Sequence, residues 1–321
     1  MQKKRMKYKT KRILTMIGIL IAIVVFGVIT SNVLQARAFR RTFEYKLTSI
    51  GWSEEDAAFL IDKLSDEELE KLLDVEVNTS IVSLMKERYF IMDYLDKYLK
   101  FKLENDSTSY SDIIALVNTG AYREWYAEIA DANLDDDILI LVNKFYTLPD
   151  GFVPENLVRI SNLYSFGNNP QVRADVLEAF VDMFYEFSSD NYSVRFYMAA
   201  PPFRTFESQS QLYNQRITQV GRERADQEVA RPGHSEHQTG LAIDVAAYGT
   251  TWQDFPNSPA GKWLARNAHT YGFILRYPEG KEHITGFVFE PWHYRYVGIE
   301  VATYIFNNNI TFDEWHAFYR R

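Results

Sequence analysis

A short segment with an unusual density of metal-binding residue types reads Ser235-Glu236-His237-Gln238-Thr239-Gly240-Leu241-Ala242-Ile243-Asp244. It joins a polar loop to the apolar residues 241–243, which have the composition of a buried β-strand. Within it, His237 and Asp244 are both able to bind a metal ion. Taken alone, His237 could equally be a hydrogen-bonded structural residue and Asp244 a turn residue. A metal site therefore needs further ligands from elsewhere in the chain.

A second segment, residues 290–296, offers such a ligand and reads Glu290-Pro291-Trp292-His293-Tyr294-Arg295-Tyr296. A catalytic zinc site takes three protein ligands from imidazole and carboxylate groups and leaves a fourth position open. His237, Asp244 and His293 could supply those three ligands. Glu290, three residues before His293, could move a proton to and from a reacting group. Residues i and i+3 of a flat strand face opposite sides, so Pro291 must mark a bend if Glu290 and His293 share a site.

The chain around these segments predicts a mixed α+β domain. Residues 138–142 form an apolar, β-rich run. Downstream, the pattern predicts a helix over 172–187, a strand over 193–199, a helix over 207–219 and then short strands. These elements alternate too irregularly for a doubly wound parallel sheet, so α+β is the better class. We place the domain boundary near residue 130 and assign residues 131–321 to this domain.

Residues 35–130 are predicted to form a helical module. Two capping patterns of the form S-x-x-[DE] each open a short amphipathic run: Ser53 with Asp56, and Ser65 with Glu68. Residues 81–103 repeat apolar side chains at intervals of three and four, which predicts one longer helix. The simplest role of this module is to hold the next domain away from a membrane. Binding of a wall component or a partner protein is the alternative.

An N-terminal apolar segment predicts a membrane anchor. Residues 13–30 are 18 residues without a charge, and as a helix they would span about 27 Å, close to the hydrocarbon thickness of a bilayer. Seven basic side chains within residues 1–12 predict a cytoplasmic tail there and export of the remainder. We therefore expect a single-pass anchor over 13–34 in the cell membrane, with an extracellular catalytic domain. A cleaved signal peptide is the alternative, since Ala36-Arg37-Ala38 resembles a small-residue cleavage site.

Composition narrows the function classes further. The 321 residues carry a formal net charge of −8, but outside residues 1–12 the balance is 28 basic against 43 acidic residues, or −15. An acidic body argues against a nucleic-acid-binding surface, which needs Lys and Arg to displace phosphate counterions. The chain has no cysteine, which excludes disulfides, thiolate ligands and cysteine nucleophiles. Any metal must therefore be held by His and carboxylate groups.

Three separated motifs resemble those of a known family. They are S-x-H-x-x-G-x-A-x-D at residues 235–244, the segment at 290–296, and Arg204-Thr205-Phe206-Glu207-Ser208-Gln209, which is similar to the family's Tyr-Arg-Ser segment followed by a glutamine. The family is that of the zinc-dependent D-alanyl-D-alanine carboxypeptidases of the VanY type, related to VanX dipeptidases and to L,D-carboxypeptidases of Gram-positive bacteria. The resemblance covers roughly residues 138–310. Departures are few: Pro202-Phe203 stands where the family has Gly-Tyr, and Thr205 where it has Ser.

The resemblance implies both a fold and a site. The implied fold is a small antiparallel sheet with flanking helices, shared by these D,D-peptidases and hedgehog-like domains. The implied cofactor is one zinc ion, with His237, Asp244 and His293 as its ligands. By the same resemblance, Glu290 is the general base and acid, and Arg204 is the cation that faces the substrate carbonyl or carboxylate.

Other residues in these motifs are weaker candidates. Ser235 and Gln209 could hydrogen-bond a peptide substrate, and could equally satisfy backbone groups of the zinc loop. We expect Trp292 and Tyr294 to pack beneath the site without touching substrate, and His234 to pack near the site without binding metal. His283, in the stretch before the second motif, is expected to lie on the surface.

Together these observations predict a membrane-anchored zinc D,D-carboxypeptidase that removes the C-terminal D-alanine from peptidoglycan stem peptides. Its partners would be the stem peptide and, through the N-terminal helix, the lipid bilayer, with no role for nucleic acid. An L,D-carboxypeptidase or an endopeptidase acting on stem peptides stays open, because the motifs encode zinc hydrolysis and not side-chain choice. A catalytically inactive wall-binding or regulatory protein is the alternative from another class.

Overall fold

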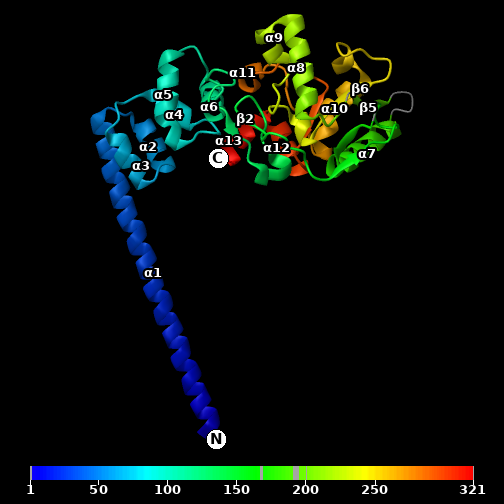
Figure 1. The fold of residues 1–321 in the computed structure, drawn as a ribbon. Helices are drawn as coiled ribbons and strands as arrows, with labels where there is room; N and C mark the ends of the chain where they lie inside the picture. Colours follow the sequence, from blue (N-terminus) through cyan, green and yellow to red (C-terminus); the bar gives the residue numbers. More distant parts are fainter. Residues whose placement is uncertain (1, 167–168, 191–194, 200, 321) are drawn as a thin grey trace. The chain divides into compact units, whose positions relative to one another are not determined.

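The computed structural model describes residues 2–166, 169–190, 195–199 and 201–320 (Figure 1). The chain divides into two compact units, residues 1–90 and 91–321. This division lies before the predicted boundary near residue 130. The reason is that α6 (Tyr110–Thr119) packs against α11 (Glu282–Thr285) and α13 (Phe312–Tyr319) within the second unit. Where a catalytic domain itself begins stays a prediction.

The first unit is helical, as predicted. Its helices are α1 (Gln2–Ile50), α2 (Glu54–Lys63), α3 (Asp66–Leu73) and α4 (Thr79–Met85). Both predicted caps are confirmed: the Ser53 side chain accepts from the Asp56 N–H at 3.0 Å, and Ser65 with Glu68 forms a complete capping box. Each cap satisfies backbone donors that a helix start leaves unpaired.

The helix α1 contains the apolar N-terminal segment. By length and composition, its residues Met16–Ile50 could cross a membrane, with a mean hydropathy of 2.5 in the most apolar window and no buried side chain there. A signal sequence near an N-terminus has the same properties. Both the anchor and the cleaved segment therefore remain compatible with the helix.

The single helix predicted over 81–103 is wrong. The chain leaves the helical conformation after Met85, passes through the short 3₁₀ helix η1 (Met92–Tyr94) and re-enters a helix at α5 (Leu95–Glu104). The break spans the boundary between the two units. A break there lets each unit bury its own apolar side chains, such as Leu84 in the first and Ile91 in the second.

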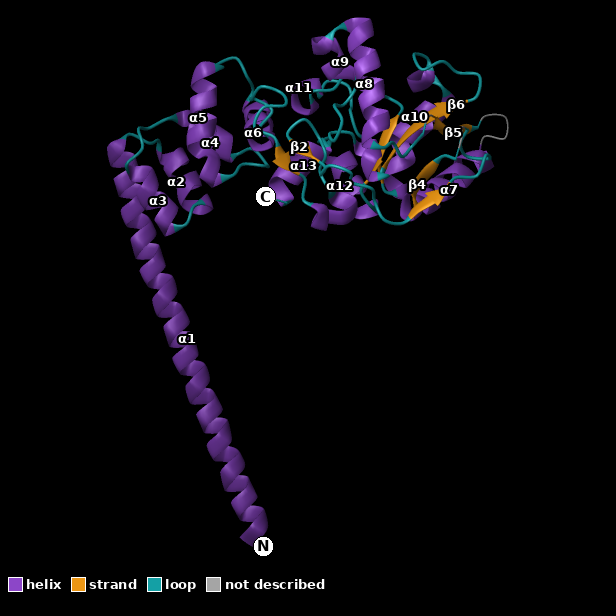
Figure 2. Cartoon of the chain, viewed as in Figure 1, coloured by secondary structure: helices purple, strands orange, loops and turns teal. Residues whose placement is uncertain are grey.

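The second unit is built on a four-stranded antiparallel sheet (Figure 2). Its strands in spatial order are β5 (Phe196–Ala199), β6 (Ala242–Ala247), β8 (His293–Tyr296) and β7 (Phe273–Leu275). The helices around it include α7 (Ala174–Asp190), α8 (Phe206–Val220), α9 (Arg222–Glu228), α10 (Pro259–Asn267) and α12 (Ile299–Asn308). Two two-stranded sheets complete it, β1 (Ala130–Asp131) with β2 (Tyr146–Thr147) and β3 (Leu157–Arg159) with β4 (Gln171–Arg173). Mixed helices with small sheets agree with the predicted α+β class.

One face of the four-stranded sheet forms the core. Side chains alternate between the faces of a strand, and Phe196, Ile243 and Val245 on the core face are fully buried. They belong to one apolar cluster with the inner side of α7, where Phe180 lies 5.6 Å from Phe196 between ring centroids. The opposite face carries the intervening residues and is free to hold polar groups.

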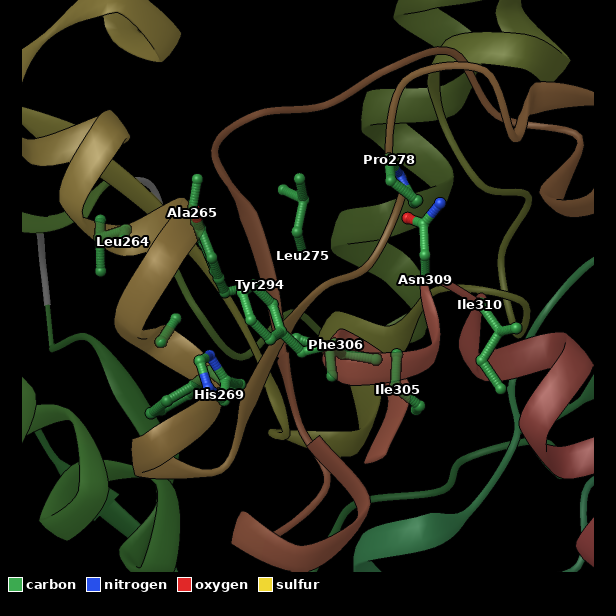
Figure 3. Close-up of a pocket in the computed structure, with 13 residues that line it drawn as sticks. Leu264, Ala265, His269, Leu275, Pro278, Tyr294, Ile305, Phe306, Asn309 and Ile310 are labelled. Atoms are coloured by element: carbon green, nitrogen blue, oxygen red, sulfur yellow. The ribbon is translucent and has the colours of Figure 1, made fainter. Parts of the chain in front are cut away.

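A cavity of about 210 Å³ lies on the core side of β8 (Figure 3). It is bordered by Tyr294 and Leu275 of neighbouring strands and by residues of α12. The His269 ring stacks on Phe306 at 3.8 Å between ring centroids, so one edge of the cavity is closed by two parallel rings.

The apolar residues 138–142 do not form the predicted β-structure, although residues 140–142 are buried and residues 138 and 139 are partly buried. Residues 138 and 139 end a 3₁₀ helix, η2 (Leu134–Leu139), and residues 140–142 belong to no helix or strand. The carbonyl oxygens of Ile138 and Ile140 instead accept from Nη2 of Arg295 at 3.0 and 2.8 Å. The Arg295 side chain thus provides hydrogen bonds that a neighbouring strand would otherwise provide.

The other predicted elements lie close to their expected places. The helix predicted over 172–187 is α7, that over 207–219 is α8, and the strand predicted over 193–199 is β5, which begins at Phe196. Residues 193 and 194 lie outside the described residues.

Lys144 is a buried cation within this fold. Its side chain is 1% exposed, donates to the backbone carbonyl of Asp226 and lies 4.0 Å from the Phe287 ring centroid. Burial disfavours the ammonium form and lowers the pKa of Lys144 to about 7.

The Lys144 environment predicts a pH-dependent stability. An unfolded lysine has a pKa of about 10.4, so between pH 7 and 10 the unfolded chain binds one proton more than the folded chain. Wild type should therefore gain stability relative to Lys144→Met as pH rises through this range. Urea unfolding of the two proteins at several pH values measures the difference. The same comparison for the exposed Lys262→Met should be flat, and a flat result for Lys144→Met would contradict the assignment.

Candidate metal centre and active site

Three candidate ligands meet on the open face of the sheet. Potential ligand atoms of His237, Asp244 and His293 all lie within 4.8 Å of one another. Asp244 of β6 is paired in register with His293 of β8, which places their side chains together. His237 comes from the 3₁₀ helix η3 (Glu236–Thr239), which precedes β6. Gly240 joins the two at φ +68°, a backbone conformation that glycine adopts without strain.

In each histidine, one ring nitrogen bonds to a group outside the set of candidate ligands. Nδ1 of His237 donates to the Pro202 carbonyl at 2.7 Å, and its Nε2 lies 3.3 Å from Asp244 Oδ2. Nε2 of His293 lies 3.4 Å from Glu236 Oε2, and its Nδ1 lies 3.0 Å from Asp244 Oδ1. Bonds of this kind fix which nitrogen can face a metal. They leave Nε2 of His237 and Nδ1 of His293 beside the carboxylate.

Glu236 was missed by the sequence analysis as a residue with a role in the site. Its side chain has 0% exposure and accepts from Arg276 Nε at 2.7 Å and Arg295 Nη1 at 2.9 Å. Burial would raise the pKa of Glu236, but the two arginine charges hold it well below its usual range. One signal was present in the sequence. Arg276 directly follows the apolar residues 273–275, and Arg295 lies within the segment 290–296. Arginine is rarely buried without a countercharge, so two arginines in such segments indicate a buried acidic partner.

The hydrogen bonds around Glu236 extend through Arg276 to the C-terminal helix α13. Arg276 Nη1 donates to Asp313 Oδ2 at 2.5 Å, and Asn143 Nδ2 donates to Asp313 Oδ1 at 2.7 Å. The carbonyl of Asn143 lies 2.7 Å from Nδ1 of His234, whose ring packs edge-on against Tyr126. His234 is thus a packed, hydrogen-bonded residue and is not among the clustered ligands, in agreement with the prediction.

Glu290 lies beside the ligands in a turn. Its Oε2 is 3.8 Å from Nδ1 of His293, and the His293 N–H bonds back to the Glu290 carbonyl at 3.1 Å. The chain therefore bends around Pro291 before β8 begins, as the shared site required. Burial raises the pKa of Glu290 to about 7, so its carboxyl group can both accept and release a proton near neutral pH.

Arg204 approaches the carboxylate of Asp244 from another side. Its Nη2 is 3.8 Å from Asp244 Oδ2, and its backbone N–H donates to the His237 carbonyl at 3.3 Å. The buried Nε has no hydrogen-bond partner within the described part of the chain. Thr205, which stands where the family has Ser, caps α8 by accepting from the Ser208 N–H at 3.2 Å. The hydroxyl is therefore used to start the helix that follows the arginine.

A pocket of about 180 Å³ brings the predicted residues together. All seven candidates line it: Arg204, Gln209, Ser235, His237, Asp244, Glu290 and His293. Gln209 is buried, and its Nε2 donates to the Ala230 carbonyl at 2.7 Å. Trp292 also lines this pocket, so it is not confined to the packing role expected of it. His283 is exposed, as predicted, and lies 3.6 Å from Asp112.

Comparison with known proteins agrees with this geometry. The VanY family model, described as D-alanyl-D-alanine carboxypeptidase, matches residues 169–299. YodJ of Bacillus subtilis is 37% identical over 186 residues, which are 56% of this chain and 67% of YodJ. A D-alanyl-D-alanine carboxypeptidase of Enterococcus faecalis is 32% identical over 55% of this chain and 65% of its own length. The structure of the LdcB LD-carboxypeptidase superposes with a TM-score of 0.55 at 34% identity, covering 60% of this chain and 91% of LdcB.

These matches place the second unit in a family of carboxypeptidases. The chain belongs to the VanY family of D-alanyl-D-alanine carboxypeptidases. The family match falls entirely within the second unit.

The Glu236 contacts predict a large loss of stability when its charge is removed. Glu236→Gln would leave Arg276 and Arg295 buried with too little countercharge, which costs about 3 to 5 kcal/mol when a buried pair is broken. Chemical denaturation measures the change. Glu128→Gln is the matched control, because its ion pair with Arg123 is on the surface and should contribute less than about 1 kcal/mol. Equal stabilities of the two variants would show that Glu236 is not a structural charge.

Proposed function

We propose that this protein is a zinc D,D-carboxypeptidase that removes the C-terminal D-alanine from peptidoglycan stem peptides. The observation that carries the proposal is one pocket lined by two imidazoles, a carboxylate, a second carboxyl group and a guanidinium. Membership of the VanY family supports the reaction class. Without the convergence of these groups, family membership alone would leave an inactive copy possible.

The donor set suits a zinc ion. Nε2 of His237, a carboxylate oxygen of Asp244 and Nδ1 of His293 would hold it, and two histidines with one carboxylate are a common catalytic zinc set. The remaining nitrogens are bonded to Pro202 and Glu236, which orients both rings before any ion binds. A bound zinc ion supplies Lewis acidity toward the scissile carbonyl and an attacking water.

Glu290 is proposed to handle the proton. Its carboxylate would accept the proton of the attacking water as the carbon–oxygen bond forms. It would then give that proton to the departing amine as the carbon–nitrogen bond breaks, releasing free D-alanine and a shortened peptide. The position of Oε2, 3.8 Å from a candidate ligand atom, supports this role.

Arg204 is proposed to neutralise the negative charge of the substrate. A guanidinium stays charged and can grip a carboxylate or a developing oxyanion through two parallel hydrogen bonds. Its Nε, which lacks a partner among the described residues, supports a role toward a ligand. Ser235 and Gln209 would provide further hydrogen bonds to the peptide from the same pocket.

The cellular arrangement is also part of the proposal. The apolar part of α1 would anchor the chain in the cell membrane with residues 1–12 in the cytoplasm. The second unit would then lie outside the cell, where peptidoglycan is found. Fractionation of expressing cells, with protease accessibility of the second unit, tests this arrangement.

L,D-carboxypeptidase activity is the second candidate function. It is favoured by the likeness to LdcB, an LD-carboxypeptidase, across 91% of that protein. An endopeptidase acting on crosslinks would use the same groups. An inactive wall-binding or regulatory protein is disfavoured, because a degenerate copy would be expected to have lost a ligand or the proton carrier.

Product analysis distinguishes these functions. Full-length protein in detergent, supplied with zinc, should release D-alanine from pentapeptide-bearing muropeptides, as read by mass spectrometry. Loss of D-alanine only from tetrapeptides would move the assignment to L,D-carboxypeptidase activity. Glu290→Gln should lower kcat/KM by about a hundredfold or more, the usual contribution of a general acid and base. Glu279→Gln, an exposed carboxylate, should retain activity; equal activities of the two variants would rule out Glu290 as the proton carrier.

The metal assignment predicts one tightly bound zinc ion per chain. Chelation should abolish hydrolysis, and added zinc should restore it. His237→Ala should lose both zinc, measured by elemental analysis, and activity, because two ligands bind the ion far more weakly than three. His283→Ala changes an exposed histidine and should keep its zinc. Full zinc content in His237→Ala would remove this residue from the ligand set.

A further inference from the structure

Two groups of contacting aromatic side chains lie on and beside the strands that carry the active-site pocket. We call them the aromatic platform: Phe166, Tyr197, Tyr248, Trp252 and Trp292. Three of them are strongly exposed, Phe166 at 51%, Tyr248 at 52% and Trp252 at 42%. Exposed apolar rings gathered in one place mark interaction sites more often than chance.

Within each of the two groups of the platform, the rings contact one another. Tyr197 and Tyr248 lie 4.8 Å apart between ring centroids, and Phe166 lies 5.1 Å from Tyr197. Trp252 packs edge-on against Trp292 at 5.2 Å with an interplanar angle of 69°. Mutual packing restrains each ring, so little side-chain freedom would be lost when a ligand binds.

Two tyrosines of the platform lie on the same face of the sheet as the candidate ligands. Along β6, Asp244 and Ala246 point to one face, while Val245 and Ala247 are buried on the other. Tyr197 is paired in register with Ala246, so it shares the face of Asp244. The Tyr248 N–H donates to the Arg195 carbonyl at 3.1 Å, which continues the β5–β6 pairing (Figure 1) and places Tyr248 on this face too.

Trp292 connects the platform to the pocket. It lines the pocket beside His293, and its carbonyl accepts from the Val245 N–H at 2.9 Å. The tryptophan pair of the platform therefore borders the site proposed to hold the end of the peptide.

We propose that the aromatic platform binds the glycan of peptidoglycan, the amino sugars that carry the stem peptide. This proposal rests on the function proposed above and extends the same site to a second part of the substrate. Each pyranose ring has an apolar C–H face that can stack on an aromatic ring, while its amide and hydroxyl groups stay in water. Tyrosine and tryptophan suit such a contact because they combine an apolar body with a polar tip.

The length of the substrate matches the separation of the two sites. A stem peptide is joined to the sugar by its amino end, so four residues separate the scissile bond from the sugar. Four extended residues span about 14 Å at most. Asp244 and Tyr248 are also four residues apart along an extended segment, or about 14 Å. A peptide with its end in the pocket would thus deliver its sugar to the platform.

Charge favours a neutral sugar over an anionic lipid surface as the occupant. Outside residues 1–12 the chain has 28 basic and 43 acidic residues, a balance of −15. Binding to anionic lipid headgroups usually depends on clustered Lys and Arg. The sugars of a peptide-bearing strand present no comparable charge, because the acid of the sugar is used in the bond to the peptide.

The test compares two substrates that differ only in the sugar. Full-length wild type should hydrolyse disaccharide-pentapeptide with a kcat/KM about threefold to tenfold above that for free pentapeptide, the range expected for one or two aromatic contacts. Tyr248→Ala and Trp252→Ala should bring this ratio close to one. Tyr122→Ala, which removes an aromatic ring of similar exposure elsewhere in the same unit, should keep the wild-type ratio.

Three outcomes would overturn the proposal. A wild-type ratio of one, with free pentapeptide cleaved, would reject the glycan site and leave the proposed function intact. Equal losses on both substrates in Tyr248→Ala would mean that the platform holds peptide. An unchanged ratio in both variants would assign the rings to another occupant, such as lipid. Quenching of tryptophan fluorescence by peptide-free disaccharide, reduced in Tyr248→Ala, gives a reading that does not need hydrolysis, and its absence from wild type would also reject the glycan site.

Discussion

The buried carboxylate of Glu236 is the interaction on which the second unit depends. It follows Ser235 in the loop that carries His237, it lies 3.4 Å from the His293 ring, and it accepts from Arg276 and Arg295. An uncompensated charge in a protein interior is very costly, so these groups can be buried only together. The loop and the ends of two strands must therefore meet at one point. The same contacts therefore hold both the core and the candidate site together.

One face of the sheet packs into the core, and the other face carries the groups of the candidate site. Because side chains alternate along a strand, β6 buries Ile243 and Val245 in the core and presents Asp244 between them to the pocket. The candidate ligands on paired strands are held by the backbone ladder, which positions groups more accurately than a loop can. The loop residue His237 obtains comparable restraint from its bond to the Pro202 carbonyl. Tyr248, four residues after Asp244, continues the same face just beyond the end of β6.

Several elements could be predicted from the sequence because their signals are local. The caps at Ser53 and Ser65, the helix α8 and the bend at Pro291 each depend on residues within one or two turns of the chain. The predictions that were wrong depended on contacts between residues far apart in the chain. The apolar residues 138–142 had the composition of a strand, but Arg295 supplied hydrogen bonds to their carbonyls from a distant position. The helix expected over 81–103 breaks where two separately packed units meet, which periodicity within one window does not reveal.

Composition and motif spacing already identify the chemical groups that the protein can use. Without cysteine, a metal site had to be built from histidine and carboxylate, and the spacing within residues 235–244 and 290–296 identified one such set with a neighbouring carboxyl group. Only the tertiary structure decided which nitrogen of each histidine faces the others, and that Glu236 is neutralised by two arginines. The physical reason is distance along the chain: those arginines are 40 and 59 residues from Glu236, and no local pattern records a contact that forms only when the sheet closes.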